Sequence, residues 1–181
     1  MRIVAGKHRG LSLYEFEASN IRPTTDRVRE NIFNKIQFGI VGSAVLDLFC
    51  GTGAVSLEFI SRGAEKVVSV DNNAKSIKLI NQNFAKAKIK PTLIKSDYKS
   101  GILSQKGTKF DFIFLDPPFD TDFGEDSIKM IEMHDILAED GLIIFEHLVG
   151  KDFQLPSRFE IVDSRKYGTI AVTYIKGKNN D

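Results

Sequence analysis

Cysteine is almost absent from this sequence, and other features typical of secreted, metal-binding or membrane proteins are missing too. The single cysteine excludes an internal disulfide, and the three histidines lie far apart without metal-ligand spacing. The first residues have no apolar signal-peptide core, and no run approaches the ~18 apolar residues of a membrane helix. We therefore expect a cytoplasmic protein, a monomer, that binds neither a metal ion nor a membrane.

The formal net charge is only +1, but the charges are distributed unevenly along the 181 residues. Residues 1–40 contain seven Lys and Arg against four Asp and Glu. Residues 120–140 contain eight acidic residues and one lysine. This asymmetry predicts two faces of opposite charge, although the acidic block is also typical of a solvated helix face.

From residue 44 onward, segments with strand and helix patterns alternate, which predicts a Rossmann-like, doubly wound α/β fold. We expect one domain with a mostly parallel, seven-stranded sheet, in which residues 1–40 form a basic appendage and residues 41–181 the α/β core. The expected strands are 2–4 and 11–13 in an N-terminal hairpin, 45–49, 66–71, 92–95, 110–115 and 142–146, and a closing antiparallel hairpin of 159–164 and 169–175. The expected helices are one of about a dozen residues after Thr24 or Thr25, and 54–62, 74–87 and 125–137.

The first strand of the core runs into a glycine turn, Asp47-Leu48-Phe49-Cys50-Gly51-Thr52-Gly53, which is followed by a helix. Such a turn brings backbone N–H groups and a helix N-terminus close to a bound ligand. Acids recur at the carboxyl ends of successive strands, where ligands bind in open α/β sheets; they are Asp47, Asp71, Asp97 and Asp116. The spacing from Gly53 to Asp71 suits a carboxylate that binds ribose hydroxyls, and by itself it fits NAD equally well.

Asp116-Pro117-Pro118-Phe119 follows the strand at 110–115 and narrows the choice of cofactor. The prolines remove two N–H donors, so that carbonyl oxygens remain as acceptors between a carboxylate and an aromatic ring. Two acceptors directed at the hydrogens of an exocyclic amino group would hold its lone pair toward an electrophile. Phe119 is suited to stack on the base that carries this group.

These motifs resemble those of class I S-adenosylmethionine-dependent methyltransferases that methylate amino groups. The segment from Arg22 to Glu30, Arg-Pro-Thr-Thr-Asp-Arg-Val-Arg-Glu, together with the basic start at residues 2–10, resembles the RsmD-type 16S ribosomal RNA guanine-N2 methyltransferases. This resemblance implies methyl transfer from S-adenosylmethionine to a guanine N2 in small-subunit ribosomal RNA, either free or in the assembling subunit. Two alternatives remain open: methylation of adenine N6 or cytosine N4 in DNA, and a non-catalytic nucleotide-binding module.

On this interpretation the candidate residues form three groups. The catalytic residues are Asp116, Pro117 and Phe119. The cofactor-binding residues are Asp47, Phe49, Gly51, Gly53, Asp71, Asn72, Asp97, Tyr98 and Asp116. The RNA-binding residues are Lys7, His8, Arg9, Arg22, Arg27 and Arg29, although Arg22 or Arg29 could instead pair with an acid of the core.

Overall fold

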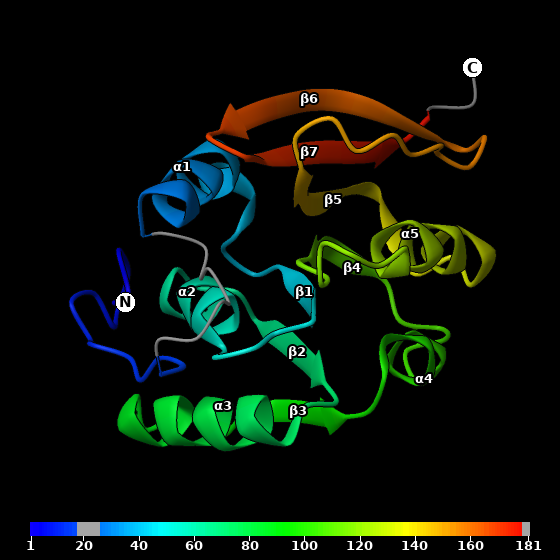
Figure 1. The fold of residues 1–181 in the computed structure, drawn as a ribbon. Helices are drawn as coiled ribbons and strands as arrows, with labels where there is room; N and C mark the ends of the chain where they lie inside the picture. The colour runs from blue at the N-terminus through cyan, green and yellow to red at the C-terminus, as the bar shows by residue number, and fades with distance from the viewer. Residues whose placement is uncertain (18–25, 179–181) are drawn as a thin grey trace.

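A seven-stranded sheet forms the centre of the molecule, which confirms the expected fold class (Figure 1). The computed structural model describes residues 1–17 and 26–178. The strand order is β3-β2-β1-β4-β5-β7-β6, in which β1 to β5 are parallel and β7 is antiparallel to both of its neighbours. The strands are β1 Ala44–Leu48, β2 Lys66–Asp71, β3 Thr92–Lys95, β4 Phe110–Leu115, β5 Leu137–Leu148, β6 Phe159–Tyr167 and β7 Ile170–Gly177.

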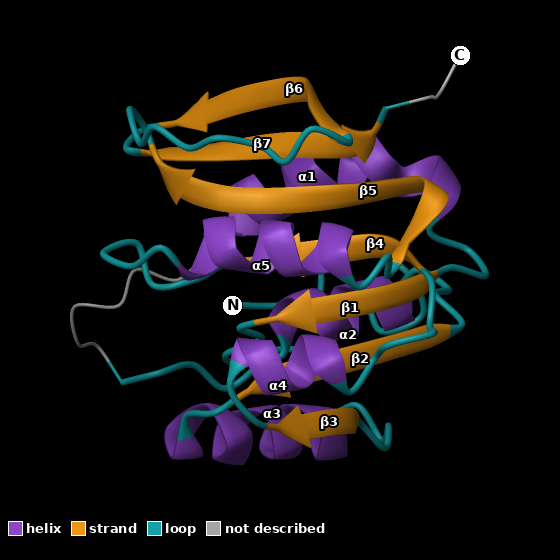
Figure 2. Cartoon of the chain, turned by 90° about the vertical axis from the view of Figure 1, so that its right-hand side faces the viewer, coloured by secondary structure: helices purple, strands orange, loops and turns teal. Residues whose placement is uncertain are grey.

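Helices cover both faces of this sheet, as the crossovers between parallel strands require. In Figure 2, α4 and α5 lie in front of the sheet, and α1, α2 and α3 lie behind it. The helices are α1 Asp26–Ile36, the 3-10 helix η1 Gln37–Gly39, α2 Ala54–Ser61, α3 Ala74–Lys86, α4 Tyr98–Leu103 and α5 Phe123–Met133.

The alternation of side chains along the central strands divides the core between the two faces. Leu46 of β1 belongs to a buried cluster with Ile128 of α5. The preceding residue, Val45, belongs to a second cluster with Phe33 of α1 and Phe59 of α2. Each side chain in these positions contributes roughly 1.5–3 kcal/mol of burial free energy, so both helical layers are fixed to the sheet.

The segments expected as strands at 2–4 and 11–13 do pair, since the N–H of Ile3 donates to the carbonyl of Leu11 and the N–H of Leu13 to the carbonyl of Met1, both at 3.0 Å. Among the described residues of this segment, a single bridge pairs Arg2 with Ser12. The backbone N–H groups of Val4 and Ala5 donate to the buried carboxylate of Glu58, at 2.8 and 3.0 Å. The expected hairpin is therefore present, but its pairing is limited to one bridge, and the chain after Ile3 is held by α2.

Three further differences from the expected elements concern the second half of the chain. The sequence pattern did not indicate α4, which is only six residues long. The helix expected to reach residue 137 ends at Met133, because Asp135 has a φ of +50° and the chain turns into the sheet. Strand β5 begins at Leu137, well before residue 142, and its pairing with β4 is irregular between Phe110 and Phe112.

Within the described residues, no helix is both long enough and apolar enough to span a lipid bilayer. The same part of the chain holds no group of three or more His, Cys, Asp or Glu side chains placed to bind a metal ion.

Candidate active site at the carboxyl edge of the sheet

The parallel register brings the candidate residues to one edge of the sheet. Leu48, at the end of β1, lies opposite Val70 of β2 and Leu115 of β4. The glycine turn, Asp71 and Asp116 directly follow or complete these three strands, so they occupy neighbouring positions. Figure 1 faces this edge, with the N-terminal segment on its left and α4 and α5 on its right.

The glycine turn has a conformation that few side chains tolerate. Phe49, Gly51 and Gly53 have φ values of +63°, +54° and +77°. A Cβ on Gly53 would lie 2.5 Å from Cγ1 of Ile80 in α3, so only glycine fits this close approach. The N–H of Gly53 donates to the carbonyl of Cys50 at 2.8 Å, and α2 begins at the next residue.

Asp71 links the glycine turn to the chain that follows β2. Its Oδ2 accepts a hydrogen bond from the N–H of Gly51 at 2.9 Å, and its Oδ1 accepts one from the N–H of Asn73 at 2.8 Å. The side chain is half-buried and lines a pocket. Asp71 is therefore both a structural support of the turn and a carboxylate at the edge of that pocket.

Asp47 lies inside β1, below the glycine turn, and it is almost fully buried. Its Oδ2 accepts a hydrogen bond of 2.5 Å from Oγ of Ser56, which also lies 2.7 Å from Oγ of Ser69. Burial raises the pKa of Asp47 to about 7; the Ser56 hydrogen bond opposes this shift, and the charges of Asp116 and Asp71 add to it. Asp47 thus carries a proton that is easily lost near neutral pH.

A pocket of about 130 Å³ opens beside these carboxylates. Tyr98 and Phe123 form part of its wall, with ring centroids 4.9 Å apart, and Phe49 stacks parallel to Phe123 with centroids 6.4 Å apart. The hydroxyl of Tyr98 donates to Asp126 at 3.3 Å. The pocket is lined by Phe49, Val70, Asp71, Asn72, Ser96, Asp97, Tyr98, Pro118 and Phe123.

Five of the expected cofactor residues thus meet in one pocket. The sequence did not indicate the other four lining residues. The most informative of these is Phe123, which was assigned to a loop because the helix was expected to begin at Glu125. Asp97 lines the pocket but also caps α4, since its carboxylate accepts hydrogen bonds from the N–H and Oγ of Ser100 at 2.9 and 3.1 Å. These bonds lower the pKa of Asp97.

The loop from Asp116 to Phe119 leaves β4 at the same edge. Asp116 and Phe119 are half-buried, whereas Pro117 is buried. Gly124, in the first turn of α5, allows this packing, because a Cβ there would lie 2.3 Å from Cε2 of Phe145 and 3.2 Å from Cγ of Pro117. The loop closes where the N–H and Oγ1 of Thr121 donate to the carbonyl of Pro118, at 3.2 and 2.7 Å.

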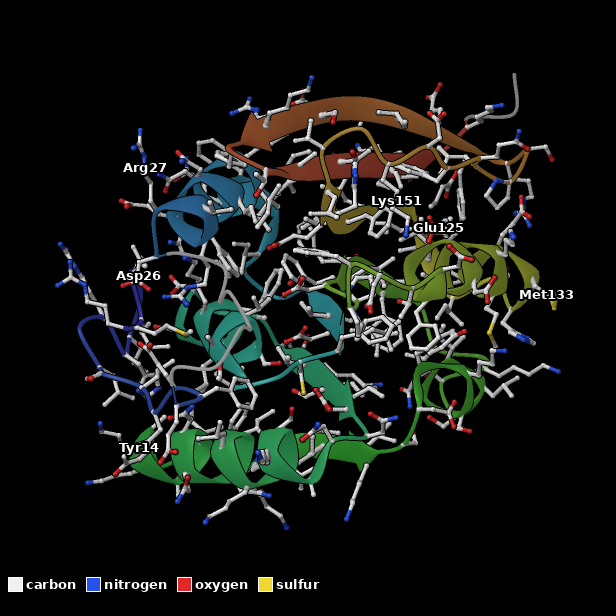
Figure 3. All side chains as sticks on the ribbon, viewed as in Figure 1. Tyr14, Asp26, Arg27, Glu125, Met133 and Lys151 are labelled. Carbon is white, nitrogen blue, oxygen red and sulfur yellow. The ribbon has the colours of Figure 1, made fainter. Side chains whose placement is uncertain are left out.

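The expected RNA-binding residues differ in their exposure. Lys7, Arg9 and Arg27 are exposed, and His8 is half-buried, with its N–H donating to Oγ of Ser61 at 2.9 Å. Arg22 lies outside the described residues. Figure 3 shows Arg27 projecting from the side of the molecule that carries the N-terminal segment.

The expectation that Arg29 binds RNA is wrong, because this residue is 1% exposed and faces the interior. Its guanidinium donates to the carbonyl of Arg2 and to Asp26, at 2.9 Å from the latter, and Nε lies 4.0 Å from the buried carboxylate of Glu58. Arg29 therefore fastens the N-terminal segment to α1 and α2 and does not reach the surface. A charged glutamate within the apolar sequence of α2 was the available signal for this buried network.

Comparisons with known proteins identify relatives of this chain in sequence and in fold. The family described as conserved hypothetical protein 95 matches residues 1–176. Ribosomal RNA small subunit methyltransferase D of Escherichia coli strain K12 is 32% identical over 94% of this chain and 87% of its own length. YlbH of Bacillus subtilis strain 168 is 33% identical, over 97% and 98%.

The solved structure of yhhF from Escherichia coli superposes with a TM-score of 0.87 at 31% identity, covering 98% of each chain. Similarity in sequence and in fold thus extends over almost the whole length of these relatives. The chain belongs to the conserved hypothetical protein 95 family, the family of ribosomal RNA small subunit methyltransferase D.

Proposed function

We propose that this protein transfers a methyl group from S-adenosylmethionine to the exocyclic N2 amino group of a guanine in 16S ribosomal RNA. The observation that carries the proposal is the meeting of two sets of residues in one pocket. Asp71 and Tyr98 come from the set expected to bind the cofactor, and Pro118 comes from the loop expected to bind the target amine. The name of the Escherichia coli relative supports small-subunit ribosomal RNA as the substrate.

The side chains at the pocket fit S-adenosylmethionine. Asp71 provides a carboxylate for ribose hydroxyls, and the rings of Phe49, Tyr98 and Phe123 provide an apolar wall for an adenine. The glycine turn and the N-terminus of α2 suit the polar amino acid end of the ligand. When bound, the cofactor supplies an electrophilic methyl group.

The residues of the loop after β4 would act on the amine. Asp116 and the carbonyl of Pro117 accept hydrogen bonds from its two N–H groups. These bonds direct the nitrogen lone pair toward the methyl group, and Phe119 stacks on the base. No general base is needed before transfer, because the nitrogen loses a proton readily once it is methylated. These residues thus provide orientation, which by itself supplies a large part of many rate enhancements.

The N-terminal appendage would hold the RNA. Lys7, Arg9 and Arg27 are exposed on this side, whereas α5, which contains much of the acidic segment 120–140, lies on the opposite face of the sheet (Figure 1). Phosphates are therefore attracted to the face that carries α1 and α2 and repelled from the face that carries α5.

Methyl transfer from radiolabelled S-adenosylmethionine tests the proposal directly. The purified protein is incubated with small-subunit ribosomal RNA, with the assembled small subunit or with DNA, and the labelled nucleosides are then identified by chromatography. We expect N2-methylguanosine from ribosomal RNA. Label in adenine or cytosine of DNA would indicate a DNA methyltransferase, and cofactor binding without transfer to any substrate would indicate a non-catalytic module.

A further inference from the structure

Lys151 lies on the loop after β5, beside the loop that carries the proposed amine acceptors. Strands β4 and β5 are parallel neighbours, with Leu115 opposite Phe145, so the segments that follow them emerge at the same edge. Figure 3 shows Lys151 next to Glu125 of α5, with which it forms an ion pair. No role was assigned to this lysine from the sequence.

The ammonium group of Lys151 is directed toward the segment that follows Phe119. Nζ donates to the carbonyl of Thr121 at 2.6 Å and lies 3.1 Å from Oε1 of Glu125 and 4.0 Å from Oδ1 of Asp122. Only 19% of the side chain is exposed. The ammonium group is thus directed mainly at partners within the protein.

Thr121 connects Lys151 to the proposed catalytic loop. Its N–H and its hydroxyl both donate to the carbonyl of Pro118, and they close the turn that contains Phe119. Lys151 also compensates the charge of Glu125. The Glu125 side chain is 11% exposed, and its Oε2 is buried without a hydrogen-bond partner among the described residues. Loss of the ammonium would leave this carboxylate poorly compensated.

The backbone around Lys151 is fixed to the sheet without help from the loop after β4. The N–H of Val149 donates to the carbonyl of Thr169 at 2.9 Å. The ring of Phe153 packs edge-on against Phe145 and His147, with centroids 5.2 and 5.0 Å apart. The backbone at Lys151 is therefore anchored to the sheet, and its side chain can hold the loop after β4 in place.

We propose that Lys151 is a positioning residue for methyl transfer, which fixes the segment Asp116–Thr121 so that its acceptors meet the target amine. This inference rests on the proposed function, because it assumes that the loop after β4 binds the amine. Lys151 itself is not among the residues that line the pocket. Its loss would displace the acceptors, whereas Asp71, Asp97 and Tyr98 of the cofactor pocket end or follow other strands and would keep their positions.

The variant Lys151→Met tests this proposal, because it keeps an unbranched side chain of similar length and removes the charge. A displacement of about 1 Å in the reacting groups lowers rates on the order of 100-fold, so we expect a fall in kcat of this size at saturating RNA. The affinity for S-adenosylmethionine, measured by calorimetry, should change far less than kcat, because Pro118 is the one residue of 116–121 that lines the pocket. The matched control is Lys109→Met, whose Nζ also contacts a carbonyl and a carboxylate, those of Leu137 at 3.4 Å and Asp135 at 2.7 Å, at the other edge of the sheet.

Two further measurements separate positioning from a merely structural role or a direct RNA contact. Lys151→Arg retains the charge and should recover most of kcat. Thr121→Ala removes the hydroxyl link to Pro118, so its effect on kcat should be clearly less than additive with that of Lys151→Met, since both act through the same turn. Additive effects, or an equal loss of kcat and thermal stability in the Lys109 control, would overturn the proposal.

A rise in KM for RNA with a weaker salt dependence of binding and an unchanged kcat would also overturn it, because that result indicates a phosphate contact. Wild-type protein in the same assay keeps the two proposals distinct. Absence of methyl transfer by the wild type argues against the proposed function, whereas normal wild-type activity with an unaffected Lys151→Met variant argues against the positioning role alone.

Discussion

Replacing Asp71 with alanine removes a carboxylate that has two tasks in this structure. Its oxygens accept hydrogen bonds from the N–H groups of Gly51 and Asn73, at 2.9 and 2.8 Å, and the same side chain lines the pocket. The variant should therefore lose a contact to the ribose and also loosen the glycine turn. Both effects weaken binding of S-adenosylmethionine.

The expected size follows from the energy of a hydrogen bond to a charged group. Removal of such a bond costs ~1.5–3 kcal/mol, which corresponds to an increase in Kd of about tenfold to 150-fold. Loosening of the turn adds to this loss, so tenfold is a lower limit. The variant Asp71→Asn, which keeps an uncharged acceptor, should lie between alanine and the wild type.

Isothermal titration calorimetry of the cofactor with each variant provides the measurement. Asp111→Ala is the matched control, because Oδ2 of Asp111 accepts a backbone hydrogen bond of 2.8 Å from Ala44 at the opposite end of β1. We expect wild-type affinity in this control. Unchanged affinity in Asp71→Ala, or tight binding of NAD by the wild type, would refute the assignment of the pocket.

Three further predictions concern catalysis, pH and RNA. Asp116→Ala should abolish most methyl transfer while cofactor affinity changes little, because Asp116 does not line the pocket, and wild-type turnover in a radiolabel assay would mean that this loop is structural. The pKa of Asp47 is about 7 in the folded state and ~3.9 in the unfolded state, so the folded state binds one more proton between these pH values. The cofactor-free protein should therefore lose up to ~4 kcal/mol of stability as the pH rises from about 4 to about 7. Urea unfolding at pH 5 and pH 8 should show a smaller loss for Asp47→Asn, and parallel losses in the two proteins would contradict the burial argument. The double variant Lys7→Ala and Arg9→Ala should lower RNA affinity and reduce the slope of log affinity against log salt by up to ~1.5, as measured by filter binding. If affinity and slope do not change, the RNA is held elsewhere, and the turn after Arg165 is the next surface to test.

Elements whose burial dominates their sequence could be predicted closely. Strand β4 has the expected bounds, Phe110–Leu115, because nearly every residue in it is apolar and both of its faces are covered. The six-residue α4 could not be predicted, since it is stabilised by contacts distant in sequence. Its Gly101 packs so closely on β2 that a Cβ would lie 2.6 Å from Cγ1 of Val70.

The candidate site was predictable where motif and strand end coincide, and less so where partners come from elsewhere in the chain. The register of parallel strands explains why Asp71 and Asp116 share one edge. Helical spacing alone did not show that Arg29 faces inward, because its partner Glu58 lies on another helix. Similarly, Lys151 gave no sequence signal, because its contacts, the carbonyl of Thr121 and the carboxylate of Glu125, are distant in sequence.

The most direct test of the central claim is the nucleoside content of 16S ribosomal RNA in a bacterium from which the gene for this protein has been deleted. Mass spectrometry should show the loss of one N2-methylguanosine, its restoration by the wild-type gene and no restoration by a gene that encodes Asp116→Ala. An unchanged content of N2-methylguanosine in the deletion strain, or full restoration by the Asp116→Ala variant, would contradict the account.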